Sequence, residues 1–224
     1  MRLFSDSIGR KAVMAVTGLL MVLFVIGHLL GNLNIFRGPD GINSYAFHLH
    51  ELPPVVWGTR VVMGVSVILH VILAVIITLE NWAAKPVKYA ETRRLRSTFA
   101  GRTMIWSGLL IGAFVVYHLL QFTFRAGFTL PSDLVLGTDL QGRFDVFGMV
   151  SASFVMAGIA AVYVVGMIVL FLHLSHGFQS TWQTLGLATA KTLPGFGTLG
   201  TWLSTIFLIG FGAIPLVILF GILR

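Results

Sequence analysis

The sequence of 224 residues contains no cysteine. This absence excludes structural disulfides, iron–sulfur clusters held by thiolates and the covalent attachment of haem in c-type cytochromes. Charged residues are also scarce, at 10% of the chain, whereas hydrophobic residues make up 56%. A soluble core cannot use so much apolar surface, and the composition therefore predicts an all-α integral membrane protein.

Five apolar segments are long enough to cross a hydrocarbon core, which takes about 20 helical residues. They cover residues 12–36, 56–80, 102–125, 146–176 and 198–222. The links between them are short, and their Gly/Pro-bearing stretches at 37–41 and 193–197 are typical of turns. We therefore expect one transmembrane domain over residues 1–224, with no soluble domain.

Charge separates the links into two kinds. The basic residues near the second link are Lys85, Lys88, Arg93, Arg94, Arg96 and Arg102, and the aspartates of the third link are Asp133, Asp139 and Asp145. By the positive-inside rule the N-terminus and the 81–101 link are cytoplasmic, and five crossings leave the C-terminus outside. The net charge of +7 then reflects topology and contact with anionic lipid headgroups, so no nucleic-acid partner is expected.

Two stretches ninety residues apart are nearly identical. Residues 18–30 and 108–120 share Gly-Leu-Leu, Phe-Val and His-Leu-Leu at matching positions. Because the first and third segments cross in the same direction, the repeat predicts two helical hairpins related by an axis along the membrane normal. The first four segments would form the bundle, and the fifth lies outside the repeat.

Four histidines stand in the four repeated segments. His28 and His118 fall at equal depth, about five residues or roughly 7 Å past the middle of their segments toward the outer face. His70 and His173 lie deeper, toward the cytoplasmic side. A polar ring in hydrocarbon is costly unless something binds it, and the pattern predicts two stacked bis-histidine sites for haem iron.

Other roles for such histidines remain open at this point. A histidine within a membrane can form an interhelical hydrogen bond or relay protons, as in a haem-free proton-coupled transporter. An imidazole that ligates iron is neutral, and its second nitrogen needs a partner. We expect the carbonyl one turn earlier, at Phe24, Ser66, Phe114 and Val169. Nearby glycines that would leave room for a flat macrocycle are Gly27, Gly31, Gly64, Gly112 and Gly166.

The segments 7–11 (SIGRK), 13–19 (VMAVTGL) and 27–33 (GHLLGNL) resemble the membrane anchor of succinate dehydrogenases and fumarate reductases. The likeness is to the single-chain, five-helix, di-haem type of the succinate:quinone oxidoreductase family. In that family a glycine follows the fourth-helix ligand by four residues, which His173 and Gly177 satisfy. His176, one turn further along the same face, is the alternative ligand.

The resemblance implies a function for the chain. His28 and His118 would hold the distal haem b, His70 and His173 the proximal one. The chain would pass electrons between a cytoplasmic iron–sulfur subunit and a membrane quinone, either menaquinone or ubiquinone, in a prokaryotic inner membrane. The FAD and the iron–sulfur clusters would be on partner subunits, the first of them a flavoprotein subunit, so the succinate site is not on this chain. Another haem subunit, from a hydrogenase or a formate dehydrogenase, remains an alternative.

Two further groups of residues are weaker candidates, one for a quinone site and one for contacts with haem propionates. Glu51, with His48 and His50, lies in the link 37–55 and is expected to be either an ordinary solvated loop or a quinone site, because quinol oxidation needs a proton acceptor at the membrane edge. Arg102 and Lys11, at the inner ends of paired segments, are candidate partners for haem propionates.

Overall fold

A computed structural model describes residues 6–84, 98–125 and 137–223. The basic residues Lys85, Lys88, Arg93, Arg94 and Arg96, together with Asp133, lie outside these ranges. Within them the chain is an all-α integral membrane protein with five helical spans long and apolar enough to cross a bilayer. The predicted fold class is confirmed.

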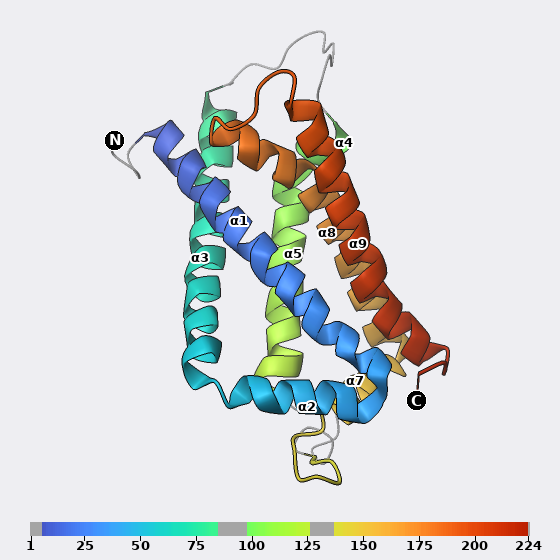
Figure 1. Ribbon diagram of the computed structural model, residues 1–224. Helices are drawn as coiled ribbons and strands as arrows, with labels where there is room; N and C mark the ends of the chain where they lie inside the picture. Colours follow the sequence, from blue (N-terminus) through green and yellow to red (C-terminus); the bar gives the residue numbers. More distant parts are fainter. Residues whose placement is uncertain (1–5, 85–97, 126–136, 224) are drawn as a thin grey trace.

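The spans run alternately up and down (Figure 1). They are α1 (Ser7–Asn32), α3 (Pro53–Ala83), α5 (Met104–His118), α8 (Ala157–Thr184) and α9 (Leu193–Leu219). The shorter elements are η1 (Leu33–Arg37), α2 (Gly38–His50), α4 (Phe99–Arg102), the π-helical turn η2 (Leu119–Thr123) and α7 (Val146–Phe154). The helix α1 runs in the same direction as α5, as the repeat predicts. The N-terminus lies at one end of the bundle and the C-terminus at the other.

The fifth span packs closely beside the fourth because small residues face bulky ones. A Cβ atom at Gly200 of α9 would lie 3.0 Å from the Cβ atom of Phe178 in α8, and one at Gly210 would lie 2.8 Å from Leu29 of α1. In a membrane, where lipid is as apolar as the helix surface, such close van der Waals packing holds helices together. The span outside the repeat is therefore fastened to the bundle along α8 and α1.

Three expectations about element boundaries are wrong. The link 37–55 is not a loop: Gly38–His50 form α2, which lies across the end of the bundle in Figure 1. The stretch 193–197 begins α9, because a proline in the first helical turn loses no hydrogen bond. The segment 146–176 is two helices, separated at Val155 and Met156, where Met156 takes an extended conformation with ψ of 106°.

A polar clasp joins α2 to α7 and to the residues before it. Asn43 is fully buried, donates to Asp139 at 3.2 Å and to Asp145 at 3.0 Å, and accepts from the backbone N–H of Phe147 at 2.9 Å. Arg143 binds Asp139 at 2.8 Å. A buried amide satisfied on both sides is directional, so this clasp fixes where α2 crosses the bundle.

Asp139 stabilises the clasp only while it is ionised. Burial raises the pKa of Asp139, but hydrogen bonds from Arg143 and Asn43 outweigh it and hold the pKa below its usual value. Because the pKa is lower in the folded state, the stabilisation is present at neutral pH. It is lost as the pH falls from about 4, the usual pKa of Asp, through the folded value.

We predict that Asp139→Asn lowers the melting temperature of the detergent-solubilised protein by a few degrees at pH 7, measured by circular dichroism. The difference from wild type should vanish as acid protonates Asp139. Asp40→Asn is the matched control, since its carboxylate also binds Arg143 but is 84% exposed and should change little. Equal melting of wild type and Asp139→Asn at pH 7 would contradict the role of the clasp.

Candidate functional site

The structure brings the histidines together in two pairs. The ring centroids of His28 and His118 are 5.8 Å apart, and those of His70 and His173 are 6.5 Å apart. The first pair joins α1 to α5 near the end that carries α2. The second joins α3 to α8 closer to the N-terminal end, where His70 reaches Met14 in the early part of α1.

These separations suit two imidazoles bound to opposite faces of one metal ion. An imidazole nitrogen binds a metal at about 2 Å and lies about 1 Å from the centre of its own ring, so the two centroids would be about 6 Å apart. Among the described residues no group of three or more His, Asp or Glu side chains is arranged to hold a metal ion. Two imidazoles alone would leave the other positions on a metal to a second group, which a planar macrocycle could supply.

Hydrogen bonds to Nδ1 leave Nε2 of His70 free. Nδ1 of His70 lies 3.0 Å from the carbonyl oxygen of Met14 and 3.3 Å from Oγ1 of Thr17. A carbonyl can only accept, so the proton of His70 is on Nδ1. Nε2 then keeps its lone pair, which is the form that ligates iron.

His173 is held in the same way by the repeated residues of α5. Oγ of Ser107 lies 3.0 Å from Nδ1 of His173 and donates its own proton to the carbonyl of Met104, so it accepts from the imidazole. Ser107 and Met104 follow Thr17 and Met14 by ninety residues, so the repeat positions equivalent partners for the two rings.

Two glycines of the repeat let the helices approach these rings. A Cβ atom at Gly18 would lie 3.2 Å from Cε1 of His70, and one at Gly108 would lie 3.2 Å from Cε1 of His173. Both distances are tighter than ordinary contact. The Gly-Leu-Leu match that opens the repeat therefore marks where α1 and α5 pack on the partner imidazoles.

The other pair has different neighbours. Nδ1 of His118 lies 3.3 Å from the hydroxyl of Tyr163 in α8. His28 stacks on Phe24, with centroids 5.4 Å apart and planes 17° apart, and its ring also lies 5.8 Å from Phe211. A hydrogen bond and stacked rings thus orient this pair.

The expected own-helix carbonyl partners are wrong for three of the four histidines. His70, His118 and His173 bond to Met14, Tyr163 and Ser107 on neighbouring helices, not to Ser66, Phe114 and Val169. The sequence offered one signal for these partners, the conservative match of Thr17 and Ser107 within the repeat. It offered none for Tyr163, which lies in the helix where the repeat fades.

The glycines expected to leave room for a macrocycle divide into two groups. A Cβ atom at Gly31 would strike Tyr45, and one at Gly166 would strike Phe114, both within 2.8 Å, so these two serve helix packing. At Gly27, Gly64 and Gly112 an added Cβ would meet nothing within 4 Å. Of the five expected glycines, these three face open space.

The remaining candidates are His176, Lys11 and Arg102, none of which is a member of either pair. The ring of His173 lies beside that of His70. The ring of His176 packs on α4 instead, where a Cβ atom at Gly101 would lie 3.0 Å from it. Lys11 is exposed on α1, and Arg102 is exposed with its guanidinium 6.0 Å from the Phe99 ring. Both are at the N-terminal end of the bundle.

The cluster of Glu51, His48 and His50 is at the C-terminal end of α2. Nδ1 of His48 lies 3.0 Å from the Glu51 carboxylate, and both side chains are more than half exposed. His50 donates to the carbonyl of Ala46 at 2.7 Å. All three residues are exposed at the surface of the bundle.

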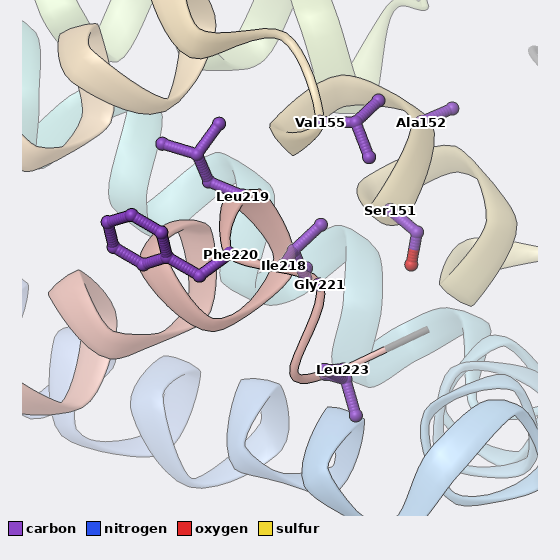
Figure 2. A pocket seen from close by; sticks show the side chains of 8 residues that line it. All are labelled: Ser151, Ala152, Val155, Ile218, Leu219, Phe220, Gly221 and Leu223. Atoms are coloured by element: carbon purple, nitrogen blue, oxygen red, sulfur yellow. The ribbon is translucent and has the colours of Figure 1, made fainter.

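Figure 2 shows a pocket of about 490 Å³ at the end of the bundle, between α7 and the C-terminal part of α9. The lining is apolar, with Val155, Phe220 and Leu223 among its residues, except for the hydroxyl of Ser151. No histidine lines it, so it has no axial ligand to offer and is separate from the two pairs.

No protein-family model, curated protein or solved structure matches the chain.

Proposed function

We propose that the chain is the di-haem membrane anchor of a succinate:quinone oxidoreductase, holding one haem b between His28 and His118 and another between His70 and His173. The observation that carries the proposal is the pair of imidazole separations, 5.8 Å and 6.5 Å, which match two axial ligands on one iron. Bound haem iron would change between the ferric and ferrous states and so carry single electrons across the bilayer.

The protein's own contribution is to orient the ligands. Met14 and Ser107 accept the Nδ1 protons of His70 and His173, which keeps each Nε2 available and each ring in one tautomer. The apolar helices around the pairs exclude water, which favours a neutral imidazole. With no covalent link to the porphyrin, because the chain has no cysteine, these contacts decide where the group binds.

The likeness of residues 7–19 and 27–33 to the anchor family supports the choice of complex. It implies a flavoprotein subunit and an iron–sulfur subunit on the cytoplasmic side, which we place at the N-terminal end of the bundle, where Lys11 and Arg102 lie. A hydrogenase or formate dehydrogenase would bring different soluble subunits, so the proteins that copurify with the chain distinguish these complexes.

We place quinone at the opposite end, next to Glu51 and His48. The contact between these side chains, at 3.0 Å, combines a carboxyl group and an imidazole at the surface of α2, where a quinol could transfer protons. This end also carries the His28 and His118 pair, so an electron carrier and a proton acceptor are at the same end of the bundle.

We predict two low-spin haem b groups per chain in the purified complex, measured by a dithionite-reduced spectrum and haem-to-protein stoichiometry. His28→Ala and His118→Ala should remove the same haem or convert it to high spin, because each takes one ligand from that pair. His70→Ala and His173→Ala should affect the other haem.

His176→Ala is the matched control, since its ring lies one turn from His173 but against Gly101. It should keep both haems. A stoichiometry of one, or loss of a haem in His176→Ala, would refute the corresponding pair, and a spectrum without haem would favour the proton-coupled transporter.

Orientation is tested with single cysteines, since the chain has none of its own. We predict that a cysteine at Thr189, in the exposed link between α8 and α9, reacts only from the cytoplasmic side. A cysteine at Gln141, at the other end, should react only from outside, because positive-inside topology puts the basic links in the cytoplasm. Labelling of Thr189→Cys from outside in intact cells would show that the orientation is the reverse of the predicted one.

For the quinone site, we predict that Glu51→Gln slows quinone turnover about a hundredfold while both haem spectra stay intact, because it removes a proton acceptor. Succinate oxidation with a soluble dye bypasses quinone and should be spared. Asp40→Asn, an exposed carboxylate on the same helix, is the control. Normal quinone turnover in Glu51→Gln at every pH between about 5 and 9 would remove this cluster from the site.

A further inference from the structure

The helix that carries His118 changes its hydrogen bonding directly after that residue. Leu119–Thr123 form the π-helical turn η2, and the N–H of Phe124 bonds to the carbonyl of Leu119 at 2.8 Å. A π-helical turn takes in an extra residue and rotates the side chains that follow, and such turns are frequent at functional sites. Here the turn contains Gln121, whose side chain is buried with 1% exposure.

Gln121 belongs to a chain of hydrogen bonds that begins at His118. The Tyr163 hydroxyl lies 3.3 Å from Nδ1 of His118 and donates to Oε1 of Gln121 at 2.9 Å. A tyrosine has one hydroxyl proton. Since that proton points to Gln121, the Tyr163 oxygen presents a lone pair to His118, and the imidazole proton must be on Nδ1.

The chain of hydrogen bonds has no counterpart in the first half of the repeat. The residue ninety positions before Gln121 is Gly31, which has no side chain to accept a hydrogen bond. Aromatic rings hold Tyr163 on several sides, with centroids 4.9 Å away at Phe154 and 5.1 Å away at Phe114. Tyr163 is only 8% exposed, and these rings hold it in place, so its contact with His118 belongs to the packed interior of the bundle.

We propose that Tyr163 and Gln121 are positioning residues for His118, which keep its proton on Nδ1 and lower the reduction potential of the haem that it binds. The part that concerns haem rests on the proposed function. A hydrogen bond from Nδ1 makes Nε2 a stronger electron donor, which stabilises ferric over ferrous iron. Gln121 acts through Tyr163, because it takes the hydroxyl proton that would otherwise be free to point at the imidazole.

The first test is a redox titration of the complex, followed by haem absorbance. Tyr163→Phe keeps the ring but removes the acceptor, and it should shift the haem lost in His118→Ala toward the reduced form about tenfold, or about 59 mV upward for one electron. The other haem should keep its potential. Tyr117→Phe is the matched control, since its ring is 6.1 Å from Tyr163 and it takes no part in the chain of hydrogen bonds.

Gln121→Leu should move the same potential in the same direction, because Tyr163 loses the group that fixes its proton. Ser107→Ala should instead move the potential of the haem between His70 and His173. An unchanged potential in Tyr163→Phe with both haems bound would overturn the proposal, as would equal shifts in both haems.

The second test does not depend on haem. The ¹⁵N chemical shifts of a histidine-labelled, haem-free protein report which ring nitrogen carries the proton. We expect His118 as the Nδ1–H tautomer in wild type and in Tyr117→Phe, and as a mixture of tautomers in Tyr163→Phe. A wild-type His118 protonated on Nε2 would overturn this inference, whereas failure of the protein to bind any haem would overturn only the proposed function.

Discussion

An imidazole within a bilayer must satisfy its N–H group, and much of this structure follows from that requirement. An unpaired polar group in hydrocarbon costs about 2–7 kcal/mol of free energy. A single packing contact between helices stabilises the bundle by less than this. The protein meets the cost at Nδ1 of His70, His118 and His173 with acceptors on neighbouring helices. Because each of these bonds also joins two helices, the histidines hold the bundle together while Nε2 stays available.

The repeat explains why these bonds occur where they do. Thr17 and Gly18 in α1 pack on His70 of α3, and the residues ninety positions later, Ser107 and Gly108 in α5, pack on His173 of α8. The glycine lets the backbone approach the ring, and the proton on Nδ1 is accepted by the carbonyl of Met14 in α1 and by the hydroxyl of Ser107 in α5. The relation between the two hairpins is therefore clearest in these equivalent contacts between helices, even though the sequence similarity of α3 and α8 is weak.

The number and positions of the spans could be predicted from the sequence, because a run of about 20 apolar residues has only one stable conformation in a bilayer. The two histidine pairs were predicted from the repeat together with the depths of the histidines in their segments. The helix α2 could not, since Asn43, Asp139 and Asp145 meet only in the folded chain. The break at Val155 and Met156 was hidden for a similar reason: an apolar run looks the same whether one helix or two lie within it.

The hydrogen-bond partners of the histidines could not be predicted from the sequence either. A carbonyl one turn earlier is an attractive guess because it is always present, but in a regular helix that carbonyl already accepts the backbone N–H of the histidine itself. The histidines instead use acceptors on neighbouring helices, the carbonyl of Met14 and the hydroxyls of Ser107 and Tyr163. Such partners depend on which faces meet, and Tyr163 shows this most clearly, since it reaches His118 from α8 across a distance of 45 residues in sequence. A site that consists mainly of contacts between helices can therefore be predicted only in small part from the sequence of any one segment.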